Sequence, residues 1–177
     1  MAETMRSYWD VVEPVFKLID LRDQDSFFST TAVMPRPVVL LYAAHFCLSE
    51  LHNGGFLQFF WNSTGLIAPE AADGFIAIGM PKLASLLLDT AAPLGSPYPR
   101  DRDARWDALL MASGRGQHDL ESIFKGSSNM YLAFEEATEP LRFDESNRQA
   151  WELAKSENGG FGEAATRYAR SANSIRS

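Results

Sequence analysis

Apolar residues recur along the chain at helical spacing, and the strict alternation typical of strands hardly occurs. The clearest stretch is VVLLYAAHFCLSEL at 38–51, which is apolar nearly all round over its first ten residues. Such a pattern is typical of a helix that is buried on every side. Pro37 suits the first helical position, and the Asn-Gly-Gly sequence at 53–55 predicts the end, because glycine adopts the left-handed conformation that closes a helix. We therefore expect a central helix over 37–52.

Proline, glycine and polar capping residues divide the remainder of the chain into further helices. A first helix is predicted to begin near Ser7 and to break at Pro14, and a second covers 56–64 and ends at Gly65. Pro69 and Pro81 each begin a further helix, and another follows Asp103 and ends at Gly114. The last four predicted helices cover 119–125, 128–139, 145–157 and 162–175. Two stretches are predicted as connections, the long segment 22–36 and an exposed loop over 93–103, which has three prolines and a glycine.

These elements predict an all-α fold. We expect one domain over 1–177, a single-domain helical bundle-like fold of about eight helices with a central helix–Gly-Gly–helix hairpin at 38–64. The sequence Asn-Gly-Gly-Phe occurs at 53–56 and again at 158–161, each time between two helical segments. The flanking residues do not match, so we interpret the echo as one turn conformation used twice and not as an internal repeat.

Composition excludes several classes of function. The net charge of −7 disfavours direct binding to nucleic acid or to an anionic membrane. No apolar run approaches the roughly 20 residues of a membrane span, and the first residues lack the pattern of a secretory signal, so we expect a cytoplasmic protein that does not enter membranes. The single cysteine, Cys47, cannot form an internal disulfide, which fits a reducing compartment.

Catalytic and metal-binding patterns are not found either. The chain has no nucleophile elbow, phosphate-binding loop or dinucleotide-binding glycine pattern. His45 and His52 are seven residues apart, unlike the i, i+4 pair of helical zinc sites, and His118 stands alone. We therefore predict no metal, no cofactor and no catalytic residue, and we expect that the protein is not an enzyme.

The negative charge is concentrated in one part of the chain. Residues 118–163 contain ten acidic and four basic side chains, whereas the rest of the chain is nearly neutral. Five acids lie close together in this part, interrupted only by Arg142: Glu135, Glu136, Glu139, Asp144 and Glu145. A solvated helix face has this composition, and so does a surface that binds a basic partner. This set is our candidate protein-binding surface.

The densest motif is SELHNGGFLQFFWNSTG at 49–65, in which polar residues stand among aromatic ones. Gln58 and Asn62 are four residues apart and share a helix face. Two interpretations stay open: the polar groups satisfy the backbone of the glycine turn, or they form a small pocket that binds a ligand or partner. The aromatic residues likewise suit either the core of the monomer or the seam of a homodimer.

This motif resembles that of a bacterial protein family of largely unknown function, typified by a neisserial DNA-mimic protein. The family pattern is E-x-x-N-G-G-F-x-Q-F-F-x-N-x-x-G. In this chain it falls on Glu50, Asn53, Gly54, Gly55, Phe56, Gln58, Phe59, Phe60, Asn62 and Gly65. Softer similarity at 75–79 and 99–105 extends the family-like core to 38–110. The resemblance implies an all-helical fold and an acidic surface that imitates duplex DNA and occupies the DNA-binding face of a transcription factor.

The motif has a single carboxylate, that of Glu50, whereas a duplex carries one negative charge per about 1.7 Å of its axis. We therefore expect the motif to support the fold and the acidic set at 135–145 to bind the partner. The function predicted is a non-enzymatic acidic protein-binding domain, a DNA-mimic-like regulator that occludes a DNA-binding protein. One alternative is an immunity or antitoxin-like inhibitor of a basic toxin or nuclease. The other is an enzyme or small-ligand pocket at Glu50, Asn53, Gln58 and Asn62.

Overall fold

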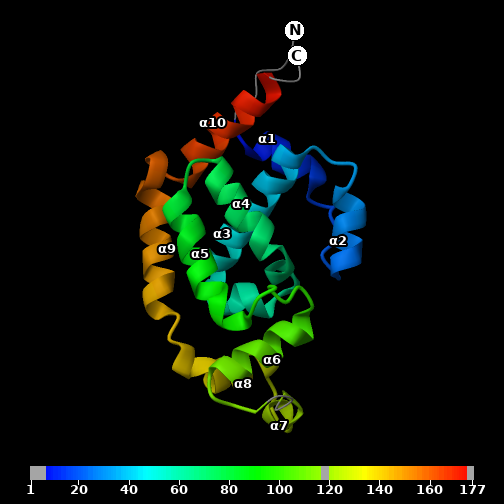
Figure 1. Ribbon diagram of the computed structural model, residues 1–177, viewed down its shortest axis with the longest axis vertical. Coiled ribbons are helices and arrows are strands. Elements are labelled where there is room, and N and C mark those ends of the chain that lie inside the picture. The colour runs from blue at the N-terminus through cyan, green and yellow to red at the C-terminus, as the bar shows by residue number, and fades with distance from the viewer. Residues whose placement is uncertain (1–6, 117–119, 175–177) are drawn as a thin grey trace.

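The computed structural model of the chain describes residues 7–116 and 120–174, and all regular elements within these ranges are helices (Figure 1). The α-helices are α1 (Trp9–Val12), α2 (Gln24–Thr31), α3 (Arg36–Trp61), α4 (Ala68–Ala77), α5 (Pro81–Ala91), α6 (Arg102–Ala112), α7 (Leu120–Phe124), α8 (Met130–Thr138), α9 (Asp144–Ser156) and α10 (Phe161–Ser174). Short 3-10 helices stand between them: η1 (Glu13–Val15), η2 (Ser63–Ile67), η3 (Ala92–Leu94), η4 (Glu139–Leu141) and η5 (Glu157–Gly159). The all-α prediction is confirmed.

The long helix α3 runs through the middle of the molecule (Figure 1). It packs against α4 and α9, and α5 packs against both of these helices. The helices α6, α7 and α8 lie at one end, and α1 and α10 lie at the other, with α2 at the side (Figure 1). The buried apolar side chains form one cluster drawn from helices along the whole described chain. The predicted central helix is therefore the element around which the others assemble.

The chain bends within α3 at the glycine pair. Gly54 and Gly55 have non-helical torsions, and Gly55 has a φ of 76°, which favours glycine. After the bend, the Phe56 N–H donates to Oδ1 of Asn147 on α9 at 2.9 Å. A Cβ atom at position 55 would lie 2.3 Å from the Asn147 amide nitrogen, so only glycine fits under this cap. The hairpin predicted for 38–64 is thus one kinked helix that ends at Trp61.

Several boundaries differ from the predictions, among them the start of α6, which is capped by Asp101 and not by Asp103. The segment 22–36 contains α2, which begins where the Asp23 carboxylate accepts from the Ser26 N–H at 2.7 Å. Gly65 ends no helix but lies inside η2, packed against the Phe59 carbonyl oxygen and the Arg105 side chain. The loop over 93–103 is not free of the body, because the hydroxyl of Tyr98 donates to the Gly65 carbonyl oxygen at 2.7 Å.

The two Asn-Gly-Gly-Phe sequences adopt different conformations, so the interpretation of one turn used twice is wrong. At the second, Asn158 and the two following glycines all have positive φ, whereas at the first only Gly55 does. The Asn158 side chain donates to the Ile78 carbonyl oxygen at 2.8 Å, and the Glu157 carboxylate accepts from the N–H groups of Lys82 and Leu83. Glu157, the residue before the second sequence, thus caps the start of α5, and Asn158 holds the turn that precedes this helix.

Candidate functional site

The Glu50 carboxylate is the centre of the polar groups in the family motif. Its Oε2 atom accepts from Gln58 Nε2 at 2.7 Å and from Asn62 Nδ2 at 2.9 Å, and its Oε1 atom accepts from the Thr64 hydroxyl at 2.8 Å. The bend in α3 brings these side chains back toward Glu50 from the far side of the glycine pair. With three side-chain donors, this partly buried carboxylate ties the two halves of the helix together.

The C-terminal end of α3 is capped from α6. Arg105, which has no exposed surface, donates to the carbonyl oxygens of Phe60 at 3.1 Å and Asn62 at 2.8 Å, and to that of Arg100. The indole N–H of Trp106 donates to the Trp61 carbonyl oxygen at 3.1 Å. Burial lowers the pKa of the Arg105 guanidinium. A cation at a helix C-terminus satisfies carbonyl groups that lack helical partners, so α6 holds the end of α3 in place.

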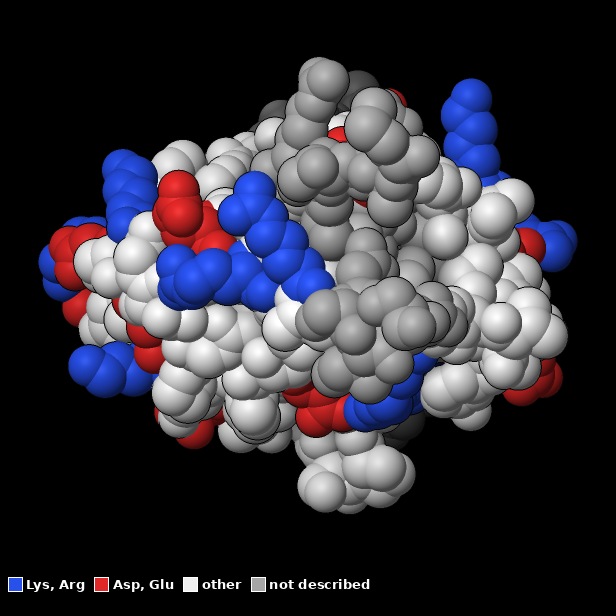
Figure 2. Space-filling model, turned by 90° about the horizontal axis from the view of Figure 1, so that it is seen from above, with Lys and Arg blue, Asp and Glu red and all other residues white. Residues whose placement is uncertain are grey.

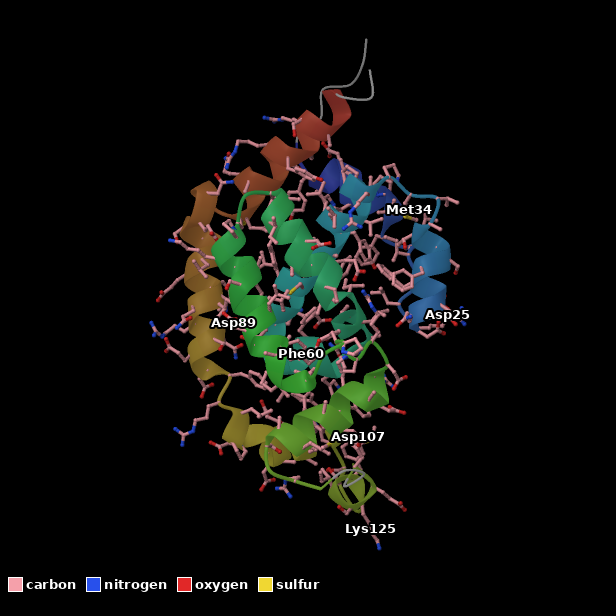
Figure 3. The ribbon with its side chains drawn as sticks, viewed as in Figure 1. Asp25, Met34, Phe60, Asp89, Asp107 and Lys125 are labelled. Carbon is pink, nitrogen blue, oxygen red and sulfur yellow. The ribbon has the colours of Figure 1, made fainter. Side chains whose placement is uncertain are left out.

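The aromatic side chains of the motif are covered within the chain. Phe56, Phe59 and Phe60 have no exposed surface, and Phe60 lies in the interior of the helices (Figure 3). Trp61 is partly buried and stacks on Trp106 with ring centroids 4.1 Å apart. Further rings from α7 and α8 surround this pair: Phe124, Tyr131 and Phe134. These aromatic residues therefore pack into the core of the chain itself.

The polar side chains of the motif contact other residues of the chain, except for that of Asn53. The polar groups of Glu50, Gln58 and Asn62 bond to one another, and the backbone after the turn is capped by Asn147, which the sequence motif does not contain. Asn53 differs because its side chain is exposed and lines a separate cavity. Both oxygens of the Glu50 carboxylate accept hydrogen bonds from side chains of the chain itself.

All five residues of the predicted acidic surface are exposed: Glu135 and Glu136 on α8, Glu139 in η4, and Asp144 and Glu145 at the start of α9. Their positions follow from the burial of Phe134 and Ala137, which turn the opposite face of α8 toward the core. Arg115 anchors the C-terminal end of α8, because its side chain donates to the Ala137 carbonyl oxygen at 3.1 Å. The acids are therefore presented on ordered helices.

The acidic residues differ in whether they are neutralised. Within the described parts of the chain, no ion pair involves Glu135, Glu136, Glu139 or Asp144. Glu145 is paired with Arg148 at 2.6 Å, and this guanidinium holds the pKa of the carboxyl below its usual range. The sequence analysis considered only Arg142 as a cation beside the five acids. It missed Arg148, which lies one helical turn after Glu145. Four uncompensated carboxylates remain.

The opposite end of the molecule has mixed charge. Figure 2 views the end at which α1 and α10 lie, and there Lys and Arg side chains stand among the acidic ones on the side of α9 and α10. Basic side chains also occur near α8 and the start of α9, among them Arg115, which contacts the end of α8, and Arg142 and Arg148.

The remaining candidate groups of the sequence analysis are the cysteine and the histidines. Cys47 is fully buried, and burial raises the pKa of its thiol, so the thiolate is disfavoured. His45 bonds to the Tyr8 hydroxyl at 3.1 Å, and His52 stacks on Trp151. His118 lies outside the described residues. Over 7–116 and 120–174, the structure has no group of three metal-ligating side chains and no helix long and apolar enough to cross a membrane.

A family model with the description DMP19-like protein matches residues 32–173. The chain belongs to this family. The match extends well beyond the 38–110 core predicted from the motif and includes the helices that carry the acidic surface. Comparison with curated proteins and with solved structures gives no match. Membership in the DMP19-like family, the family of DNA mimic protein 19, associates this fold with DNA mimicry.

Proposed function

We propose that this member of the DMP19-like family binds a DNA-binding protein through its acidic surface and occludes the face that would hold DNA. The observation that carries the proposal is the set of four exposed carboxylates without ion-pair partners among the described residues: Glu135, Glu136, Glu139 and Asp144. Family membership supports the same conclusion. The action is non-enzymatic and takes place in the cytoplasm, where DNA-binding regulators act.

The proposed mechanism is competition for basic side chains. Lys and Arg residues that otherwise contact phosphates would pair with these carboxylates, which are held on α8, η4 and the first turn of α9. Because Phe134 and Ala137 fix α8 against the core, the acids need little ordering upon binding. Exposed charge pairs are screened by salt, so the complex should weaken steeply as ionic strength rises.

The test is capture of a partner by the immobilised full chain from a lysate of its native host, followed by elution in a salt gradient and identification. We expect a basic DNA-binding protein that elutes early and is lost when Glu135, Glu136 and Glu139 are all changed to Gln. A matched control has the same loss of charge elsewhere: Glu13→Gln, Asp25→Asn and Glu163→Gln, all at exposed positions. This control should retain the partner.

Two results would contradict the proposal. Equal loss of the partner in both triple variants would indicate that net charge, and not this surface, governs binding. Retention of no protein at low salt would mean that the acids form only a solvated face. If the captured protein is a toxin or nuclease, the same surface serves an immunity or antitoxin-like inhibitor instead.

A further inference from the structure

A cavity of about 520 Å³ lies between α3, α9, the start of α10 and Tyr8, away from the acidic surface. Its lining residues are Tyr8, His45, Leu48, Ser49, His52, Asn53, Trp151, Ala154, Lys155, Phe161 and Gly162. The volume is within the range of roughly 300–1,000 Å³ that is usual for small-molecule sites. Asn53 is the one motif residue in this lining, and the proposed function does not account for the cavity.

The lining combines an apolar body with a few hydrogen-bond donors. Leu48, Ala154 and Phe161 are buried and supply the apolar wall. Ser49 and Asn53 supply neutral polar groups. The Tyr8 hydroxyl bonds to Nδ1 of His45, and in the described part of the chain no hydrogen bond uses the other ring nitrogen. A ligand in this cavity would therefore meet hydrocarbon on one side and donors on the other.

The charge of the lining is the selective feature. The eleven lining residues include one cation, Lys155, and no carboxylate, although the chain as a whole has a net charge of −7. The Lys155 ammonium lies 4.9 Å from the centre of the Trp151 ring, and that ring stacks on His52 with centroids 4.0 Å apart. These contacts hold the ammonium at the aromatic edge of the cavity and leave it without an anionic partner in the described structure.

We propose that this cavity binds a small carboxylate that has an aromatic or aliphatic body. The carboxylate pairs with Lys155 and accepts from the neutral donors beside it, and the body packs against Leu48, Ala154 and Phe161. The site is independent of the acidic surface, so its failure would leave the proposed protein partner unaffected.

The experiment titrates 4-phenylbutyrate into the isotope-labelled full chain and follows backbone amide shifts by NMR. The matched neutral probe is 4-phenylbutyramide, which has the same body. We expect saturable shifts at the lining residues and a Kd for the carboxylate at least about fivefold lower than for the amide, as for one charge pair near a surface. Equal affinity for the two probes, or no saturation below about 10 mM of the carboxylate, would overturn the proposal.

Two variants locate the binding. Lys155→Gln should raise the Kd of the carboxylate about fivefold and leave the Kd of the amide unchanged. Lys82 is an exposed lysine of α5 outside the cavity, so Lys82→Gln should change neither Kd. Gly162→Leu adds a side chain where a Cβ atom meets no other heavy atom within 4 Å, so the variant should fold with the cavity obstructed. It should abolish binding of both probes. Undiminished binding by this variant would place the probe elsewhere and contradict the assignment.

Discussion

The bend in α3 and the acidic surface of α8 and α9 are both rich in polar side chains, but they use them in opposite ways. At the bend, Glu50 accepts three hydrogen bonds, and at the end of α3 Arg105 donates to three carbonyl oxygens. On the acidic surface, Glu135, Glu136 and Glu139 have no ion-pair partners in the described structure. A polar residue bonded inside the chain supports the fold, whereas one left unpaired at the surface is available to a partner.

This difference also explains why a family motif need not mark the binding surface. The motif residues lie where the chain must bend and where α3 must end, and their substitution should act mainly on stability. The acids should act mainly on binding. Substitutions in the two regions should therefore differ in their effect on the free energy of unfolding.

Arg105→Met should have the largest effect on stability. It keeps most of the buried volume but leaves the carbonyl oxygens of Phe60 and Asn62 without their donor, and we expect the free energy of unfolding to fall by about 4 kcal/mol. Urea denaturation measures the change. Arg102→Met is the control, because Arg102 is exposed and lies only over the Trp106 ring, and it should cost about 1 kcal/mol or less. Similar losses in the two variants would contradict the capping role.

Glu50→Leu should lower the free energy of unfolding by about 2 kcal/mol, because Gln58, Asn62 and Thr64 lose a shared acceptor in a partly buried site. The same change on the acidic surface, Glu136→Leu, should stay within about 0.5 kcal/mol. Thermal and urea denaturation of both variants give the comparison. A larger loss at position 136 than at position 50 would reverse the roles assigned to the two regions.

His45 on α3 should make stability depend on pH. Burial lowers its pKa from the usual value of 6.5, so the unfolded chain binds a proton more readily than the folded one. The stability is therefore full above that value and decreases as the pH falls below it toward the folded-state pKa. His45→Asn should reduce the fall in Tm between about pH 7 and about pH 5.5, measured by circular dichroism. If the dependence of Tm on pH stays unchanged in this variant, it arises instead from His52, because burial lowers the pKa of that side chain too.

The triple change of Glu135, Glu136 and Glu139 to Gln should have the smallest effect on stability, within about 0.5 kcal/mol, because these exposed side chains have no ion pair to lose. Urea denaturation of the variant beside the wild type measures it. A loss of more than about 1 kcal/mol would show that the acids support the fold, against the comparison drawn above.

Local signals predicted most helices and failed at contacts between distant residues. Pro81 opens α5, and Gly114 follows α6, as expected from their backbone preferences. The helix α2 was missed because QDSFFSTT is rich in residues of weak helical propensity, although Asp23 was a readable N-cap. In the sequence, Gly65 predicts the end of a helix. In the structure, a Cβ atom at this position would lie 2.9 Å from Arg105 Nε, so the close approach of Arg105 requires glycine. That approach joins positions too far apart in sequence for local patterns to reveal.

The candidate site was predictable in part for the same reason. The five acids and their exposure follow from charge and helical spacing, and four of them are free of ion pairs in the described structure. The pairing of Glu145 with Arg148 was overlooked, although their spacing of three residues was a local signal. The cap of Asn147 on Phe56 and the assembly of the Lys155 cavity required the tertiary structure, because they join α9 to α3.

The most direct test of the central claim is competition between this chain and duplex DNA for the captured partner. Fluorescence anisotropy of a labelled duplex bound to the partner would be followed as the chain is added. We predict that the wild type releases the DNA and that the variant with Glu135, Glu136 and Glu139 changed to Gln requires at least about tenfold more protein, while the charge-matched control behaves as the wild type. A partner that binds the chain and stays on its DNA would contradict the account.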